Sequence, residues 1–291
     1  MSIRVSPKVP AARYGRRSFL AQMVATAGAL AAVGCTTGPG SGTGRRRNIG
    51  LQLYTVRDYM REEIATTLQR VADLGYTNVE FAGYFGQRPK RIREIVKAAG
   101  LRAPSGHVEF EQITQQPDLT IATALEIGHE YVVLGWLPQT ARRNLDDYRV
   151  LANRLNQFAR RCADHGLRFA YHNHDFEFRP VDGVRPIDVL LAQTAPGLVD
   201  FELDLYWISK AACDSAAFLR EHSGRVRMCH VKDMAIDGSI ADVGAGTLDF
   251  ENLLQIAASS GVRHYFVEHD EPKDGMASAA NSLRALERLH Q

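Results

Sequence analysis

The 291-residue chain has only four cysteines, no large excess of charge and no apolar run that makes a convincing membrane span. Cys162, Cys213 and Cys229 lack a short metal-type spacing and leave an odd number, so we expect buried thiols rather than disulfides. With 45% hydrophobic residues, and 35 basic against 33 acidic residues, the composition excludes a disordered chain, collagen and a multi-span membrane protein. A globular protein with a large core is expected.

The near-neutral total hides two regions of opposite charge. The first 47 residues hold eight basic residues and no acid, which leaves residues 48–291 with 27 basic and 33 acidic residues and a formal charge of −6. A body of this sign repels phosphate backbones. Nucleic acid is therefore not an expected partner.

The N-terminus is similar to a twin-arginine export signal. Arg16 and Arg17 precede Phe19-Leu20 and an uncharged, Ala-rich stretch. Cys35 ends a box that resembles a lipoprotein cleavage site, and ordinary signal-peptidase cleavage nearby is the alternative. We expect a signal over residues 1–34, a flexible tether over 35–47 and one folded domain over 48–291. The protein is then periplasmic or in the cell envelope, and a lipid on Cys35 would be its one membrane contact.

From residue 48 onward, short β-branched or aromatic runs alternate with longer amphipathic stretches, which predicts repeated βα units. Eight units in about 245 residues match a single-domain (β/α)₈ TIM barrel of class α/β. A doubly wound sheet would want a glycine-rich loop after its first strand, and residues 52–57 supply none. The expected strands are Ile49–Tyr54, Thr77–Phe81, Arg102–His107, Tyr131–Gly135, Arg168–His172, Leu198–Asp204, Val226–Val231 and His264–Glu268.

Helices are expected over Arg61–Leu74, Arg91–Ala99, Leu145–His165 and Phe250–Ser260. Several glycines, among them Gly75 and Gly261, fall where a helix should end, as the left-handed cap conformation requires.

Polar residues collect at the carboxyl ends of the predicted strands, where a barrel builds its active site. Positions i and i+2 of a strand share a face, so His172 with His174, and His230 with Lys232, should point together into the barrel mouth. Neutral imidazoles converging with carboxylates form a site for one divalent ion, Mn²⁺, Zn²⁺, Co²⁺ or Mg²⁺. The strand-end residues are Gln52, Tyr54, Glu80, Ser105, His107, His172, His174, Asp204, His230, Lys232 and Glu268.

Residues 49–291 resemble the xylose-isomerase-like barrel superfamily of sugar-phosphate isomerases and epimerases. The order in which short motifs appear carries the resemblance: IGLQLYTVRD (49–58), SGHVEF (105–110), AYHNHDFEF (170–178), ELDLYWISKA (202–211), CHVKDM (229–234), VGAGTLDF (243–250) and FVEHDEP (266–272).

The resemblance implies one metal ion held from strands five to eight, by His172, Asp204, His230 and Glu268. Ketose epimerases of the superfamily carry a Glu at the strand-five position, where this chain has His172. Motifs of the HNHD type look closer to inosose dehydratase and to eliminases of keto-sugars. Which of His172 and His174 faces the metal stays open, with His172 favoured by its alignment.

Three functions follow as hypotheses. The leading one is a metal-dependent sugar isomerase or epimerase acting through an enediolate, with Glu268 and His174 transferring protons, His107 in reserve and Lys232 offsetting negative charge. A dehydratase or lyase that expels a β-substituent from a keto-sugar, keto-glycoside or cyclitol is the alternative. The non-enzymatic alternative is an envelope sugar-binding lipoprotein that lost the chemistry. A phosphodiesterase similar to endonuclease IV is disfavoured, because it needs three zinc ions and a basic face.

The expected substrate is a small, unphosphorylated sugar. Tyr54, Trp136, Tyr206 and Trp207 are available to stack on a ring, and Glu80 either contacts substrate or supports the ligands. The segment VGAGTLDF could present Gly246 and Thr247 at a helix N-terminus that binds an anion, although a plain turn and N-cap is the more ordinary interpretation. The oligomeric state is not predicted.

Overall fold

A computed structural model describes residues 49–289 of the chain. The predicted export signal (1–34), the tether (35–47) and Cys35 lie outside the described residues. No helix within 49–289 is both long enough and apolar enough to cross a membrane. Cys162 and Cys229 are buried free thiols, as predicted, and Cys213 is free and partly buried.

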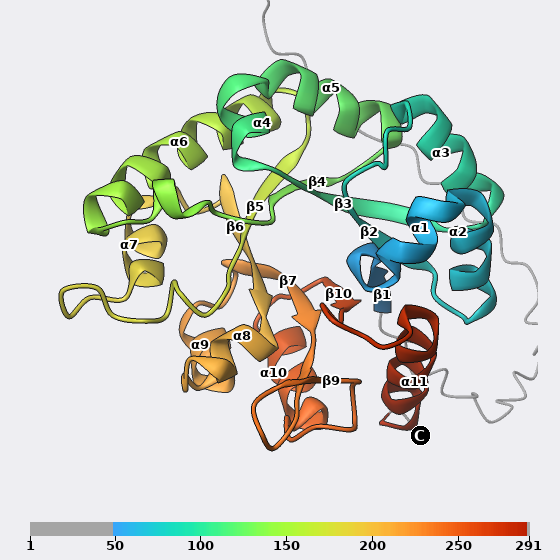
Figure 1. Cartoon of the computed structure of the whole chain (residues 1–291). Coiled ribbons are helices and arrows are strands. Elements are labelled where there is room, and N and C mark those ends of the chain that lie inside the picture. The colour runs from blue at the N-terminus through green and yellow to red at the C-terminus, as the bar shows by residue number, and fades with distance from the viewer. Residues whose placement is uncertain (1–48, 290–291) are drawn as a thin grey trace, which may run out of the picture. The chain divides into compact units, whose positions relative to one another are not determined.

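Eight parallel strands close into a barrel (Figure 1). The order around the ring is β1-β10-β7-β6-β5-β4-β3-β2, so each barrel strand pairs with its neighbours in sequence and the last closes on the first. The predicted single-domain TIM barrel is confirmed. Its strands are β1 (Ile49–Gln52), β2 (Asn78–Ala82), β3 (Arg102–Val108), β4 (Tyr131–Leu134), β5 (Arg168–His172), β6 (Val199–Asp204), β7 (Val226–Val231) and β10 (His264–Val267); β8 (Asp233–Met234) and β9 (Ile240–Ala241) form a separate antiparallel pair.

The helices follow the strands and lie outside the ring (Figure 1). The predicted helix over 61–74 is two helices, because Glu63 adopts an extended conformation and caps the second with its own side chain. Gly75 and Gly261 have φ of 110° and 99°, as predicted for helix ends. The helices are α1 (Arg57–Glu62), α2 (Ile64–Asp73), α3 (Pro89–Ala98), α4 (Phe110–Gln115), α5 (Pro117–Ile127), α6 (Leu145–Asp164), α7 (Pro186–Gln193), α8 (Leu205–Lys210), α9 (Ser215–Glu221), α10 (Phe250–Ser259) and α11 (Gly275–Arg288).

Three barrel strands end earlier than predicted, and β4 does so by one residue, at Leu134. β1 stops at Gln52, whose side chain accepts a hydrogen bond from the Tyr54 backbone N–H and begins a 3₁₀ turn over Leu53–Val56. Tyr54 therefore stands on a turn and not on a strand. β10 stops at Val267, one residue before Glu268.

Apolar side chains fill the barrel interior beneath the polar strand ends. Tyr131, Val133, Ala170, Met228 and Phe266 form a small cluster of their own, separate from the large core between strands and helices. All five are at most 1% exposed. This cluster keeps water out of the barrel below the site, which lowers the local dielectric and strengthens charge interactions above it.

The loop after β7 folds around one buried carboxylate. Asp233 Oδ2 accepts hydrogen bonds from the backbone N–H groups of Gly244 and Gly246 at 2.9 and 3.0 Å, and its Oδ1 accepts from Met234 and Leu248. A Cβ on Gly246 would lie 2.3 Å from Asp233 Oδ1, so only glycine fits. The possible anion site at Gly246 and Thr247 is not formed, and the more ordinary interpretation, a turn, holds: Asp233 accepts from the Gly246 N–H, and the Thr247 N–H donates to the Met234 carbonyl.

We expect Asp233→Ala to lower the free energy of unfolding by more than about 3 kcal/mol, because four partly buried N–H groups lose the buried carboxylate that holds the loop together. Urea unfolding followed by circular dichroism measures this. The matched control is Asp237→Ala, since Asp237 caps only Ser239 in an exposed turn; it should cost less than about 1 kcal/mol. Equal losses for the two variants would refute the anchoring role of Asp233.

Candidate metal and substrate site

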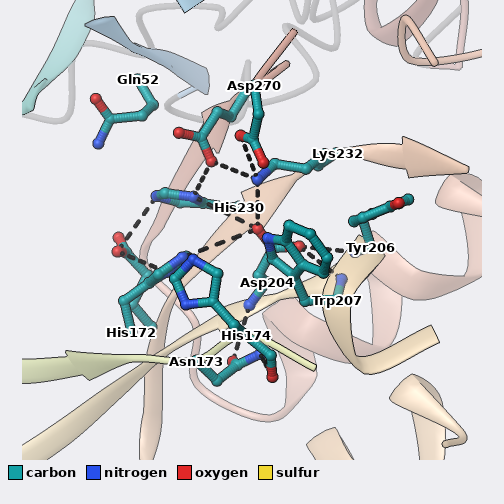
Figure 2. Close-up of polar contacts among 12 residues, drawn as sticks. Gln52, His172, Asn173, His174, Asp204, Tyr206, Trp207, His230, Lys232 and Asp270 are labelled. Carbon is teal, nitrogen blue, oxygen red and sulfur yellow. Dashed lines mark hydrogen bonds and ion pairs between the residues drawn. The ribbon is translucent and has the colours of Figure 1, made fainter. Parts of the chain in front are cut away.

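The four side chains implied as ligands meet at the carboxyl ends of four adjacent strands. Figure 2 labels three of them, His172, Asp204 and His230. His230 Nδ1 lies 2.7 Å from Glu268 Oε2 and 3.8 Å from Asp204 Oδ2, and His172 Nε2 lies 3.9 Å from the same Asp204 oxygen. All four residues are 6% exposed or less. We call His172, Asp204, His230 and Glu268 the upper donor set.

Sequence reasoning missed a buried carboxylate just below this set. Glu202 Oε2 lies 2.8 Å from His107 Nε2, 3.2 Å from His230 Nε2 and 3.3 Å from His172 Nδ1. His107, His172, Glu202 and His230 have donor atoms within 4.8 Å of one another and form the lower donor set. The available signal was spacing: Glu202 precedes Asp204 by two residues on β6, so both face the barrel interior.

Glu80 supports the imidazoles from β2. Its Oε1 lies 2.8 Å from His230 Nε2 and accepts a hydrogen bond from Gln52 at 2.9 Å. Glu80 is fully buried and is not among the cavity-lining residues. We therefore assign it to holding His230, the second of the two predicted roles, rather than to contacting substrate.

Buried anionic groups that lack partners fit a cation. Glu202 and Glu80 are both 0% exposed, and one carboxylate oxygen of each has no hydrogen-bond partner among the described residues. Burying such charges is costly unless a cation compensates them. The mixture of imidazole and carboxylate donors is the one that zinc-like divalent ions prefer, whereas Mg²⁺ favours oxygen alone. The residues present therefore fit a divalent transition-metal ion.

The electrostatics of the site keep Glu202 and Glu268 ionised. Burial alone would raise the pKa of Glu202, but the charge of His230 and the hydrogen bond from His107 outweigh it and hold that pKa well below its usual value. Burial likewise opposes ionisation of Glu268, and the charges of Lys232 and His230 lower its pKa. Ionised carboxylates are the form that binds metals.

Lys232 is a buried cation bound to three carboxylates. Its Nζ lies 2.9 Å from Asp204, 2.8 Å from Glu268 and 2.7 Å from Asp270. Burial would lower its pKa, yet these three charges raise it well above the usual value. Asp270 was not predicted as a site residue; it follows Glu268 by two positions, and burial raises its pKa to about 6.

A cavity of about 470 Å³ opens above the upper donor set. Tyr54, Trp136, Phe176 and Trp207 line it, so three of the four predicted stacking residues are in place. The fourth, Tyr206, is not: it is 4% exposed, and its hydroxyl donates to the Gly238 carbonyl instead.

His174 lies in this aromatic wall and also lines the cavity. Its ring stacks on Phe176 and meets Trp136 edge-on, with centroids 5.5 and 4.6 Å apart. Burial, with the neighbouring charges of His172 and Lys232, holds the pKa of His174 well below its usual value, so the imidazole is neutral. The buried Glu177 accepts a hydrogen bond from the His174 backbone N–H at 2.8 Å and fixes the loop.

His107 reaches the same cavity from β3. Its Nε2 contacts Glu202 and Glu80, while a Cβ on Gly135 would lie 2.3 Å from its Nδ1. Glycine at 135 thus makes room for the ring. The Nε2 of His107 is engaged below the cavity, whereas His174 belongs to neither donor set.

A closed βα barrel with metal-type donors at the carboxyl ends of its strands defines the class of the protein. The xylose isomerase-like TIM barrel family model matches residues 68–289, and the chain belongs to that family. The chain is 24% identical over 153 residues to inosose dehydratase of Clostridium beijerinckii, a match that spans 46% of this chain and about half (51%) of that protein. The same enzyme of Salmonella typhimurium is 23% identical over 225 residues, spanning 64% of this chain and 74% of the relative.

A solved structure supports the same assignment. A sugar phosphate isomerase/epimerase from Parabacteroides distasonis superposes with a TM-score of 0.72 at 25% identity. The match covers 88% of this chain and 98% of that one.

We expect Zn²⁺, Co²⁺ or Mn²⁺ to raise the melting temperature of the protein and a chelator to reverse the effect. An ion present at a hundredfold excess over its dissociation constant adds about 2.7 kcal/mol of stability. His230→Ala should abolish the shift, because His230 belongs to both donor sets. His165→Ala, on the exposed end of α6, is the control and should respond like the wild type. A wild-type protein that no divalent ion stabilises would contradict the metal site.

Proposed function

We propose that the protein is a divalent-metal-dependent enzyme that deprotonates the carbon next to the carbonyl of an uncharged keto-sugar or keto-cyclitol and then expels a β-substituent. One observation carries this proposal: a neutral imidazole, a buried ammonium and a cluster of metal-type donors lie around one cavity. These groups come from different strands, since His174 follows β5 and Lys232 follows β7.

The upper donor set would hold the ion, through His172, Asp204, His230 and Glu268. When bound there, a divalent ion polarises a carbonyl oxygen and acidifies the neighbouring C–H. Of the two histidines left open by the sequence, we assign His172 to the metal, because its Nε2 lies 3.9 Å from Asp204 Oδ2, whereas His174 belongs to no group of metal-type donors among the described residues.

His174 is the group we assign to accept the proton. It is neutral, it faces the cavity, and Glu177 holds its backbone in place. Glu268 shares its Oε2 between His230 and Lys232, and its lowered pKa makes it a weak base, so its part is to bind rather than to move a proton.

Lys232 and Asp270 face the developing negative charge. The Lys232 ammonium places a positive charge beside the substrate oxygens, and Asp270, whose pKa of about 6 lies near neutrality, supplies the proton that a departing hydroxyl needs. Removal of one C–H proton and one hydroxyl amounts to loss of water. The inosose dehydratase relatives support this outcome.

A sugar isomerase or epimerase is the second candidate. It uses the same first proton transfer and returns the proton to another carbon or another face. The resemblance in fold and in nearly full length to the Parabacteroides distasonis protein favours it.

The walls of the cavity favour an uncharged substrate. Lys232 is the only Lys or Arg among the described lining residues, and three carboxylates already surround it. Glu109, Asp175, Glu268 and Asp270 also line the cavity. A phosphate group would meet like charge on several sides.

In D₂O, the metal-loaded protein should exchange the α-hydrogen of a keto-sugar or keto-cyclitol for deuterium, which NMR detects. Mass spectrometry then separates the candidates, since elimination lowers the product mass by one water and isomerisation leaves it unchanged. His174→Gln should slow exchange by about 10²- to 10⁴-fold without changing metal affinity. The control His165→Gln should exchange at the wild-type rate. Absence of exchange across a broad panel would rule out this chemistry.

We expect kcat/KM for an unphosphorylated keto-sugar to exceed that for its phosphate ester by at least about tenfold, because like charges oppose binding of the ester. The difference should shrink at high ionic strength. Glu109→Gln, which removes one acid from the cavity wall, should narrow it as well. A higher kcat/KM for the phosphate ester would contradict the proposed uncharged substrate. It would not contradict the proposed proton abstraction and elimination.

A further inference from the structure

We propose that Arg142 is a positioning residue that orients the His174 ring through Phe176. The inference rests on the proposed function, in which His174 accepts the proton, and deepens it. Arg142 lies between β4 and α6 and is partly buried. It is not among the residues that line the cavity, so it reaches the chemistry only through its neighbours.

The His174 ring is not oriented by a hydrogen bond at Nδ1, since this buried atom has no partner among residues 49–289. The hydrogen bond that Glu177 accepts comes from the His174 backbone N–H, so it leaves rotation about the side-chain torsions free. A bond at the ring nitrogen normally sets the plane of a catalytic imidazole. Contacts with other rings must set it here.

Two aromatic rings pack against the imidazole. Phe176 lies parallel to it, at an interplanar angle of 2° with centroids 5.5 Å apart, and Trp136 meets it edge-on, at 85° and 4.6 Å. Trp136 and Phe176 are themselves nearly perpendicular, at 87° with centroids 5.5 Å apart. Offset-parallel and edge-to-face are the arrangements that aromatic rings favour. The plane of His174 therefore follows the plane of Phe176.

Arg142 fixes Phe176 in turn. Its guanidinium carbon lies 3.7 Å from the Phe176 ring centroid, a close cation–π contact, and 5.6 Å from that of Trp136. Its Nε donates a hydrogen bond to the Leu137 carbonyl at 3.0 Å and ties the guanidinium to the loop after β4. A planar guanidinium stacks with its face and donates from its edge, whereas a lysine ammonium offers no such geometry. Contacts thus continue from Arg142 through Phe176 to His174.

The main variant is Arg142→Met, measured by α-hydrogen exchange in D₂O on the keto-sugar or keto-cyclitol that the wild type exchanges fastest. We expect kcat to fall about 10- to 100-fold, because a base displaced by about 1 Å loses that much rate. KM and Zn²⁺ affinity should keep their wild-type values, since Arg142 lies outside the cavity and both donor sets. Arg143→Met is the matched control: Arg143 is exposed and paired with Asp147, and its loss should leave kcat unchanged.

A double variant separates positioning from a merely structural role. Where Arg142 acts through His174, Arg142→Met should lower the rate no further once His174→Gln has removed the ring, because residues that act as a unit are not additive. A full second loss on top of that of His174→Gln would overturn the inference. Wild-type kcat in Arg142→Met would overturn it as well.

Arg142→Lys tests the stacked geometry against charge alone. Lysine keeps the positive charge and loses both the planar group and the Nε–H that donates to Leu137. We expect its kcat to stay below that of the wild type. Full wild-type kcat in this variant would show that charge suffices and would refute the role of the stack, even if Arg142→Met failed to fold.

The orientation of the ring can also be measured without turnover, by ¹H–¹³C NMR of the Zn²⁺-loaded protein with labelled histidine. His174→Gln assigns the His174 ring resonances by their disappearance. Arg142→Met should move these resonances, because the ring currents of Phe176 and Trp136 depend on the relative positions of the rings, and Arg143→Met should not. Unmoved resonances would contradict the inference even in a protein that exchanges no substrate. Moved resonances in a protein without exchange would contradict only the proposed function.

Discussion

The site depends on one costly feature, two carboxylates buried at the centre of a barrel. Glu80 and Glu202 have no exposure to water, and an apolar layer beneath them lowers the dielectric further. Such charges are stable only where donors surround them, and imidazoles from β3, β5 and β7 do so. The histidines are therefore held by the acids as much as the acids by the histidines, which leaves little freedom in ring orientation.

The sequence was sufficient to predict the barrel and much of its mouth, because both depend on local patterns. Alternating apolar runs fix the strands, and the polar residue that ends each run lies at the carboxyl edge. Glu202 was missed because an acid two residues before Asp204 is an ordinary pattern within a strand. Its importance comes from register: Glu202 pairs with His172 across β5 and β6, and no local pattern reveals that neighbour.

The Gly246 loop shows the same limit in the opposite direction. A glycine-rich turn before a helix is a reasonable anion site when only its local sequence is considered. The group that fills it, Asp233, lies 11 to 13 residues earlier in the chain. The fold thus supplies its own anion. The N–H groups of Gly244, Gly246 and Leu248 already donate to Asp233 and are not available to a phosphate.

The residue at the end of β5 bears on the chemistry. Epimerases of the superfamily that the sequence resembles carry a glutamate at the β5 position, and it works with the β10 glutamate from opposite faces of the sugar. Here His172 takes that position, and the nearby carboxylate is Glu202, below the cavity. Because Glu268 is bound to His230 and Lys232, the mechanism we propose gives proton transfer to His174 on one side and to Lys232 with Asp270 on the other. Unlike groups suit an elimination, which removes a proton and protonates a leaving group, better than a return of the proton to the opposite face.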